Sequence, residues 1–351
     1  MTYNNRQPSE LYDWIRARIG RQPAPNVGAH RSALAMLPRI AALLAAVVIG
    51  LFPRPLLAQT TLPTPAPVLV HGSVQYDMTS KISGRTYRIF VFKPTAPPPP
   101  SGYPVVVVTD ANMTFPLAAT LNATFGFGGG RSALVVGVGY AAKDDLTPFL
   151  LRNRDLTPPT PLSGIPRSSV MPPPRLEDYG GSEEFYRFLV EELRPAIASA
   201  YSVNADDQTL YGHSLAGLFT LGVLFNHPAS FHGFVASSPS IWWDSRSVLD
   251  GEPGFAAKVQ AKEAAPRVLI LVGANEQAVP DTPLPGMTRA QMEKLMSDSR
   301  MVDNARDLAE QLRRIKGGPG YSVRFHAFED EDHLTVLPAS ISRAFAFALR
   351  P

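Results

Sequence analysis

The sequence predicts an α/β protein with a mostly parallel central sheet, helices on both faces and an antiparallel edge at its N-terminal end. Three observations favour this class. Continuous β-branched runs, such as residues 105–108 and 133–137, are typical of strands covered on both faces. Helical sequence separates the later strands, and this alternation favours parallel pairing. A strand, a tight turn and an apolar helix surround Ser214.

The expected elements follow one another in a regular order. Alternating runs at 69–76 and 85–92 predict two strands that pair as the antiparallel edge. Apolar residues at helical spacing predict an amphipathic helix over 185–201. Segment 141–181 has little periodicity and many prolines, so we expect a long loop that serves as a lid or a binding surface. Further strands are expected at 105–108, 133–137, 208–212, 233–236, 267–272 and 322–328.

The composition limits the classes of function. The chain has 351 residues, 45% of them apolar, which is enough to bury a sizeable core. It has no cysteine, which excludes disulfides, thiol catalysis and cysteine-ligated metals. The net charge is +3, but residues 1–58 hold seven of the 33 basic residues and two of the 30 acidic ones. The remainder is slightly acidic, so we expect no nucleic-acid partner.

Residues 1–58 are expected to be an N-terminal extension that carries a signal peptide. An apolar run at 40–51 follows Arg39, and Ala58 is a suitable small residue at the cleavage site. Signals normally begin close to the start of a chain, so Met36 is an alternative initiator. The run is short for a membrane span, and membrane contact is expected only through this segment if it is not cleaved. A linker at 59–67 and a catalytic domain at 68–351 follow in this interpretation, which predicts a periplasmic or secreted protein.

The segment Gly212-His213-Ser214-Leu215-Ala216-Gly217 predicts a nucleophilic serine. It joins an expected strand to an apolar helix at 218–225. A nucleophile elbow requires small residues around the serine, because the strand and helix backbones approach closely there. Gly212, Ala216 and Gly217 meet that requirement. The alternative is a serine that caps a buried helix.

A serine hydroxyl needs an adjacent base, and a third group must hold that base in position. In a fold with a nucleophile elbow, the histidine comes last in the chain. His333 lies in a loop after the expected last strand, whereas His326 alternates within that strand. His333 is therefore the candidate base. His213 is expected to point away from the serine and to be structural.

The orienting acid is expected after a strand that follows the serine. Glu276 comes just after the strand expected at 267–272, and it is the candidate. Asp281, Asp244 and the acidic cluster at 329–332 are alternatives. Consecutive carboxylates in that cluster point in different directions and lack partner histidines, so no metal and no cofactor is expected.

Acyl transfer also needs hydrogen-bond donors for the negative oxygen that develops. The backbone N–H of Leu215 is expected to supply one donor, because it lies at the positive end of the helix after Ser214. The second is expected from the loop after strand 105–108, as the N–H of Ala111 or of Asn112. The sequence does not choose between these two.

Several segments together resemble one family. They are 79–89, 152–158, 180–182, the segment around Ser214, 238–243, 272–276 and Asp332-His333. Over residues 70–349 the chain resembles the esterase branch of the α/β hydrolases that includes the enterobactin and salmochelin siderophore esterases. Two departures are Ala216, where this family usually has glycine, and Asp110-Ala111, where it usually has Asp-Gly.

The resemblance implies an α/β-hydrolase fold and a small-molecule ester substrate, with the ester bonds of a ferric siderophore as one candidate. It implies that Arg152 and Arg154 face an anionic iron chelate and that Trp242 or Trp243 stacks on catechol rings. The alternative is that the arginines pair with nearby carboxylates and the tryptophans cover the core.

Three other functions remain open at this stage. A general exported carboxylesterase acting on short acyl esters would need no cationic pocket. A non-catalytic binding protein or an acyltransferase could use the same fold, although the presence of all three expected groups argues against a silent site.

Overall fold

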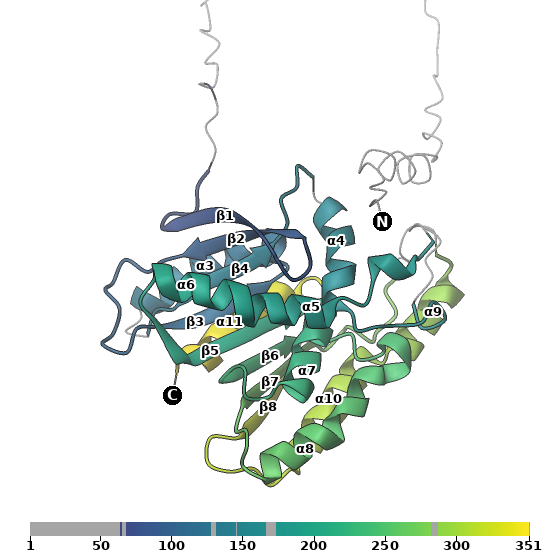
Figure 1. Cartoon of the computed structure of the whole chain (residues 1–351). Helices are drawn as coiled ribbons and strands as arrows, with labels where there is room; N and C mark the ends of the chain where they lie inside the picture. The colour runs from purple at the N-terminus through teal and green to yellow at the C-terminus, as the bar shows by residue number, and fades with distance from the viewer. Residues whose placement is uncertain are drawn as a thin grey trace, which may run out of the picture. The chain divides into compact units, whose positions relative to one another are not determined.

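The computed structural model describes Thr64 and residues 68–127, 131–144, 146–165, 173–281 and 287–350 (Figure 1). The expected signal peptide, the alternative start at Met36 and most of the expected linker lie outside these residues. Among the helices of the described ranges, none is long and apolar enough to cross a membrane.

One eight-stranded sheet organises the described chain. Its strand order is β1-β2-β4-β3-β5-β6-β7-β8. β2 runs antiparallel to both of its neighbours, and every pair from β4 to β8 is parallel. The predicted mostly parallel sheet with an antiparallel N-terminal edge is therefore confirmed. The strands are β1 (Ser73–Thr79), β2 (Thr86–Phe92), β3 (Tyr103–Thr109), β4 (Leu134–Gly139), β5 (Val203–His213), β6 (Gly233–Ser237), β7 (Arg267–Gly273) and β8 (Ser322–Phe328).

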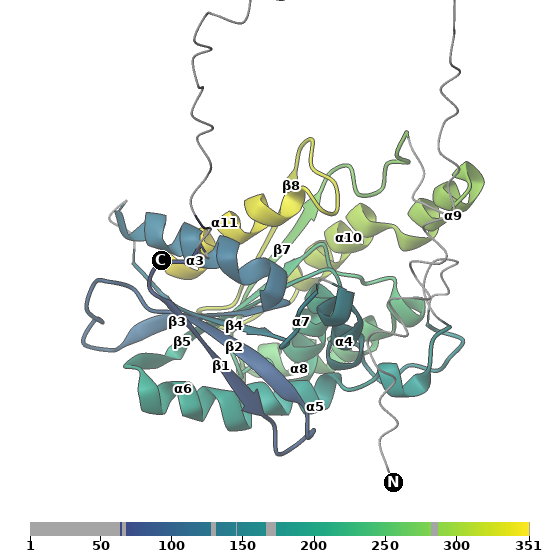
Figure 2. The ribbon, with the colours of Figure 1, turned by 90° about the horizontal axis from the view of Figure 1, so that it is seen from above.

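Helices cover both faces of the sheet (Figure 2). In β7, Val268 and Ile270 pack with α10 and other helices on one face. Leu269 and Leu271 pack with α3 and α11 on the other face. The helical elements are α3 (Ala111–Phe127), α4 (Leu146–Leu156), η2 (Leu176–Asp178), α5 (Ser182–Arg187), η3 (Phe188–Leu193), α6 (Arg194–Ala200), α7 (Leu215–Asn226), η4 (Trp243–Gly251), α8 (Glu252–Gln260), α9 (Arg289–Ser299), α10 (Met301–Arg313) and α11 (Val336–Leu349).

Two predicted elements differ locally from the structure. The first strand begins at Ser73 rather than at residue 69, because the chain turns at Gly72, which has φ +79°. The helix expected over 185–201 is a helical run of three pieces, in which a π-helix separates α5 from α6. Pro195 has no N–H to donate in the first turn of α6, and this is compatible with the change of hydrogen-bond register at that point.

The expectation of a long structureless loop over 141–181 was wrong for its first part, which forms α4. Asp144 caps this helix, since its Oδ1 accepts hydrogen bonds from the N–H groups of Leu146 at 3.0 Å and Thr147 at 2.8 Å. The residues that α4 buries include Arg152 and Asp155. Because two of the inward-facing residues are charged, the helix lacks the apolar stripe by which a helix is found in a sequence.

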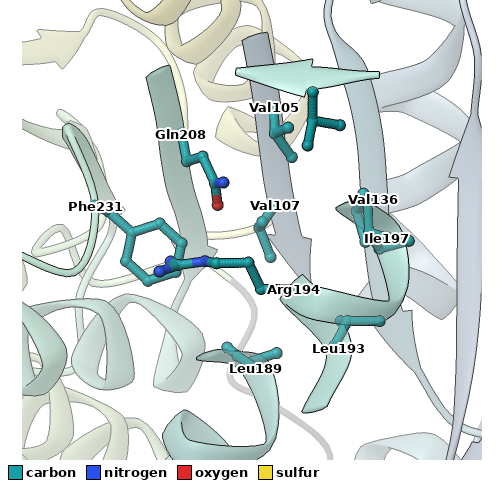
Figure 3. A pocket seen from close by; sticks show the side chains of 10 residues that line it. Val105, Val107, Val136, Leu189, Leu193, Arg194, Ile197, Gln208 and Phe231 are labelled. Carbon is teal, nitrogen blue, oxygen red and sulfur yellow. The ribbon is translucent and has the colours of Figure 1, made fainter. Parts of the chain in front are cut away.

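A small apolar cavity lies between the sheet and the helices η3 and α6 (Figure 3). Val105, Val107 and Gln208 line it from the strands, and Arg194 and Phe231 lie at one side. Its volume of about 20 Å³ is enough for a single water molecule and too small for an ester substrate.

Asp155 is a buried carboxylate that joins α4 to the sheet. It accepts hydrogen bonds from the hydroxyls of Tyr140 at 2.8 Å and Tyr87 at 3.2 Å, and Nε of Arg85 lies 3.3 Å from it. Burial raises the pKa of Asp155 to about 6, and the positive charge of Arg85 opposes this rise. The carboxylate therefore titrates above the ordinary range of an aspartate.

We expect the Asp155 carboxylate to make the folded chain less stable as the pH rises. Its pKa in the folded chain lies above the ordinary value of 3.8, so its stabilising effect is complete below that value and is lost as pH rises through about 6. Between pH 4 and pH 7 the free energy of unfolding of the wild type should fall by up to about 3 kcal/mol relative to Asp155→Asn. Denaturant unfolding at each pH measures this difference.

Asp298→Asn, at an exposed position in α9, is the matched control. Its free energy of unfolding should change with pH in the same way as that of the wild type. A constant difference in stability between the wild type and Asp155→Asn over this pH range would contradict the expectation.

Candidate active site

Ser214 lies in a sharp turn between β5 and α7. Its backbone has φ 62° and ψ −120°, a conformation that non-glycine residues rarely adopt. A Cβ atom on Gly212 would collide with the carbonyl oxygen of Ala216, and one on Gly217 would lie 2.8 Å from the carbonyl oxygen of Ser237. Glycine is therefore required at both positions, whereas Ala216 is buried without obstructing the turn. This is the geometry of a nucleophile elbow.

The structure brings the three residues singled out for acyl transfer into one hydrogen-bonded chain. His333 lies in the loop after β8, with Nε2 at 3.0 Å from Oγ of Ser214. Its Nδ1 lies 2.7 Å from Oε2 of Glu276, which follows β7. The carboxylate holds the proton on Nδ1, so Nε2 has a free lone pair toward the serine hydroxyl. This arrangement can remove a proton from Ser214.

The Glu276 side chain is fully buried, and three donors satisfy its carboxylate. Besides His333, the hydroxyl of Ser238 donates to Oε1 at 2.5 Å, and the backbone N–H of Gly273 donates to the same atom at 2.7 Å. Ser238 was not singled out from the sequence as a partner of the acid. The only indication in the sequence was that Ser238 follows β6. That strand pairs with β7, and Glu276 follows β7.

Within the described residues, the hydrogen bonds recorded for the imidazole of His333 go to Glu276 and Ser214 and to none of the alternative acids. Asp332, from the cluster 329–332, accepts the backbone N–H groups of Leu334 and Thr335. These two hydrogen bonds lower the pKa of the Asp332 carboxyl. Asp332 therefore fixes the turn that carries His333. Within the described part of the chain, no group of acidic and histidine side chains could hold a metal ion.

His213 lies against the ring of His333, with 4.8 Å between the ring centroids. It is buried, and its Nδ1 lies 3.1 Å from Oγ of Ser237. Burial, followed by the nearby His333 and Arg152, lowers the pKa of His213 well below its ordinary range. The ring is therefore neutral at neutral pH, and it packs beside the base without adding a charge.

Backbone N–H groups lie at two helix starts near the serine. Leu215 is the first residue of α7, and Ala111 and Asn112 are the first two of α3. Their N–H groups donate none of the hydrogen bonds recorded within the described ranges, as is usual for the first turn of a helix. Parallel pairing of Val108 with Tyr211 places the start of α3 beside the end of β5. Such groups are suitable donors for an oxyanion.

The four residues proposed for substrate contact are largely occupied by other partners. Arg152 is buried and binds Asp110, and Arg154 pairs with Glu184 at 3.1 Å. Trp243 is 4% exposed, and its Nε1 donates to Oγ1 of Thr160. Trp242 is half-buried, with its ring centroid 6.1 Å from that of Trp243. Of the four side chains, Trp242 is therefore the one most available to contact a substrate.

The fold and this arrangement of residues define an esterase of the α/β-hydrolase class. The family model described as "Putative esterase" matches residues 171–318. The Ferri-bacillibactin esterase BesA of Bacillus subtilis is 36% identical over 283 residues, which cover 78% of this chain and 88% of BesA. A Siderophore triacetylfusarinine C esterase of Aspergillus fumigatus is 32% identical over 253 residues, covering 68% and 79% of the two chains.

Solved structures agree with these relatives. The BES protein from Bacillus cereus superposes with a TM-score of 0.68 at 29% identity, covering 82% of this chain and 99% of that one. The Siderophore hydrolase EstA from Aspergillus nidulans gives a TM-score of 0.67 at 26% identity, covering 82% and 98%. The chain belongs to this esterase family, and the resemblance predicted from the sequence is confirmed.

We expect removal of the Ser238 hydroxyl to destabilise the fold. Ser238→Ala leaves Oε1 of the buried Glu276 carboxylate with one donor in place of two. Hydrogen bonds to charged groups contribute about 1.5–3 kcal/mol, so the free energy of unfolding should fall by about that amount. Denaturant unfolding measures the loss. Ser297→Ala, at an exposed position in α9, should change stability by less than about 0.5 kcal/mol, and an equally small effect of Ser238→Ala would refute the expectation.

Proposed function

We propose that this esterase hydrolyses the ester bonds of siderophores, with Ser214 as nucleophile, His333 as general base and Glu276 as orienting acid. The observation that carries the proposal is the hydrogen-bonded chain from Glu276 through His333 to Ser214. A neutral hydroxyl becomes an effective nucleophile only with such a base beside it. The same chain restricts the imidazole to the tautomer in which Nε2 accepts a proton.

Acylation begins when Oγ of Ser214 attacks the carbonyl carbon of the ester and Nε2 of His333 takes the hydroxyl proton. Glu276 stabilises the positive imidazolium that forms. The negative carbonyl oxygen accepts hydrogen bonds from the N–H of Leu215 and from that of Ala111 or Asn112, and each donor contributes roughly 100-fold to 1000-fold to turnover. The intermediate then collapses, the alcohol leaves with the proton from Nε2, and Ser214 remains acylated.

Deacylation repeats these steps with water. Nε2 of His333 takes a proton from the water molecule as its oxygen attacks the acyl carbon. When the second tetrahedral intermediate collapses, the imidazolium of His333 returns the proton to Oγ of Ser214 and the carboxylic acid leaves. An acyltransferase would use an alcohol in place of this water molecule.

The siderophore part of the proposal is supported by the relatives. BesA is named a ferri-bacillibactin esterase, and 88% of its length is covered. A Siderophore enterobactin esterase of Emericella nidulans is 32% identical over 225 residues and is 71% covered. Iron in such a molecule is part of the substrate and needs no metal site in the protein.

A general carboxylesterase acting on short acyl esters is the second candidate. Arg152 and Arg154 already have carboxylate partners, so neither is an unpaired cation that could bind an anionic chelate. Met113 and Leu334 are exposed apolar side chains, and each is adjacent in sequence to a proposed site residue. These features favour an uncharged ester.

An ester panel tests the two candidates. Iron-free and ferric enterobactin, ferric bacillibactin and nitrophenyl butyrate are assayed under one set of conditions, with products identified by mass. The siderophore proposal expects kcat/KM to be at least about tenfold higher for one of the siderophores than for nitrophenyl butyrate, because remote contacts of the correct substrate contribute to turnover. A clear preference for nitrophenyl butyrate would establish the second candidate.

The Ser214→Ala variant is included in the panel, with Ser297→Ala as its matched control. Ser214→Ala should lose on the order of 10⁶ in turnover on every ester, because the base then has no nucleophile to activate. Retained hydrolysis in this variant would show that the chosen serine is not the nucleophile.

We also infer that the chain is exported and cleaved after Ala58, as the apolar run 40–51 behind Arg39 suggests. Expression in a Gram-negative bacterium, followed by fractionation and intact-mass measurement, should give a periplasmic chain that begins at Gln59. The double variant Val47→Arg, Val48→Arg should remain uncleaved in the cytoplasm, because charge in the apolar run prevents its recognition as a signal peptide. A full-length cytoplasmic wild type would contradict export.

A further inference from the structure

The turn that follows β3 has an unusual backbone. Asp110, between β3 and α3, has φ +53°, in the left-handed region that favours glycine. The hydroxyl of Thr109 donates to the carbonyl oxygen of Tyr211 at 3.1 Å, which ties the end of β3 to β5 three residues before Ser214. The direction of the two unused N–H groups at the start of α3 therefore depends on an aspartate in a strained conformation.

Arg152, on α4, holds this aspartate with a bidentate ion pair. Its Nη2 lies 2.6 Å from Oδ2 of Asp110, and its Nε lies 2.9 Å from Oδ1 and 3.0 Å from Oδ2. The side chains are only 9% and 8% exposed. A planar guanidinium that makes two parallel hydrogen bonds to a carboxylate fixes the orientation of that carboxylate.

A second attachment holds the other side of the turn. Nδ2 of Asn112 donates to the carbonyl oxygen of Tyr140 at 2.9 Å, and the backbone N–H of Tyr140 donates to Oδ1 of Asn112 at 2.8 Å. Ala111 is therefore held between two anchored neighbours. The next two N–H groups, of Met113 and Thr114, already bond the carbonyl oxygen of Asp110, which leaves those of Ala111 and Asn112.

We propose that Arg152 is a positioning residue for the oxyanion donors, and that it acts through Asp110 rather than by contact with substrate. The inference rests on the proposed acyl-transfer function. Arg152 holds the strained turn in the one conformation that aims the N–H groups of residues 111 and 112 toward the carbonyl oxygen of the ester. Preorganised donors of this kind lower the barrier because they need no reorientation during the reaction.

Positioning and substrate contact predict different kinetics. A loosened oxyanion turn weakens binding of the transition state and leaves the ground state unchanged, so kcat falls for every ester. Loss of a cationic substrate contact raises KM, and does so chiefly for an anionic ester. Arg187 provides the matched control, because it forms a bidentate but exposed pair with Glu191.

The experiment compares Arg152→Gln, Arg152→Lys and Arg187→Gln with nitrophenyl butyrate as the neutral ester and ferric enterobactin as the anionic ester. We expect Arg152→Gln to lower kcat at least tenfold on each ester that the wild type hydrolyses, with KM changed less than threefold. Arg152→Lys should recover little, since an ammonium group cannot form the bidentate pair. Arg187→Gln should stay within twofold of the wild type. Affinity for a trifluoromethyl ketone, which mimics the tetrahedral intermediate, should fall in parallel with kcat.

An unchanged kcat in Arg152→Gln, or a rise of KM confined to the ferric ester, would overturn the proposal. If Arg152→Gln does not fold, Asp110→Asn replaces it, because asparagine tolerates the left-handed conformation and loses the charge. That variant should also lower kcat at constant KM, and an unaltered kcat would likewise overturn the proposal. Ser214→Ala distinguishes a failure of the proposed function from a failure of the role proposed for Arg152. Retained hydrolysis in Ser214→Ala would refute the proposed function itself. Loss of hydrolysis in Ser214→Ala together with an unchanged kcat in Arg152→Gln would refute only the role of Arg152.

Discussion

The parallel register of β3, β5, β6, β7 and β8 is the constraint on which the site depends. Parallel strands end at the same edge of a sheet, so the segment that follows each one emerges beside the next. Ser214 follows β5, Glu276 follows β7 and His333 lies in the loop after β8. The Asp110 turn follows β3, and Ser238 follows β6. Five segments spread over more than two hundred residues therefore meet at one edge of the sheet.

Buried carboxylates are the second theme of this structure, and each is stabilised in a different way. Glu276 accepts two hydrogen bonds besides the one from the imidazole. Asp110 has a bidentate arginine. Asp155 is bonded to two tyrosine hydroxyls, yet burial still raises its pKa to about 6. Removing a carboxylate from water is costly, and the number and charge of its donors decide how much of that cost is offset.

The sequence predicted the fold well where one physical signal dominates. Strands such as 105–108 and 267–272 were found because short apolar runs rich in β-branched residues are typical of strands buried on two faces. Helix α4 was missed, since its buried face carries Arg152 and Asp155 and so gives no apolar stripe. The break in the helix around Pro195 was also missed, because a π turn has the same composition as the α-helix around it.

The sequence by itself determined the α/β class, the elbow around Ser214 and the chain order in which an acid and a histidine had to follow it. These features depend on local steric rules and on strand order, both of which are written in neighbouring residues. Only the tertiary structure decided that Arg152 binds Asp110 and that Ser238 donates to Glu276. Such pairs join side chains about forty residues apart, and no periodicity or motif marks them, because which polar groups meet depends on how buried surfaces pack and not on their spacing in the chain.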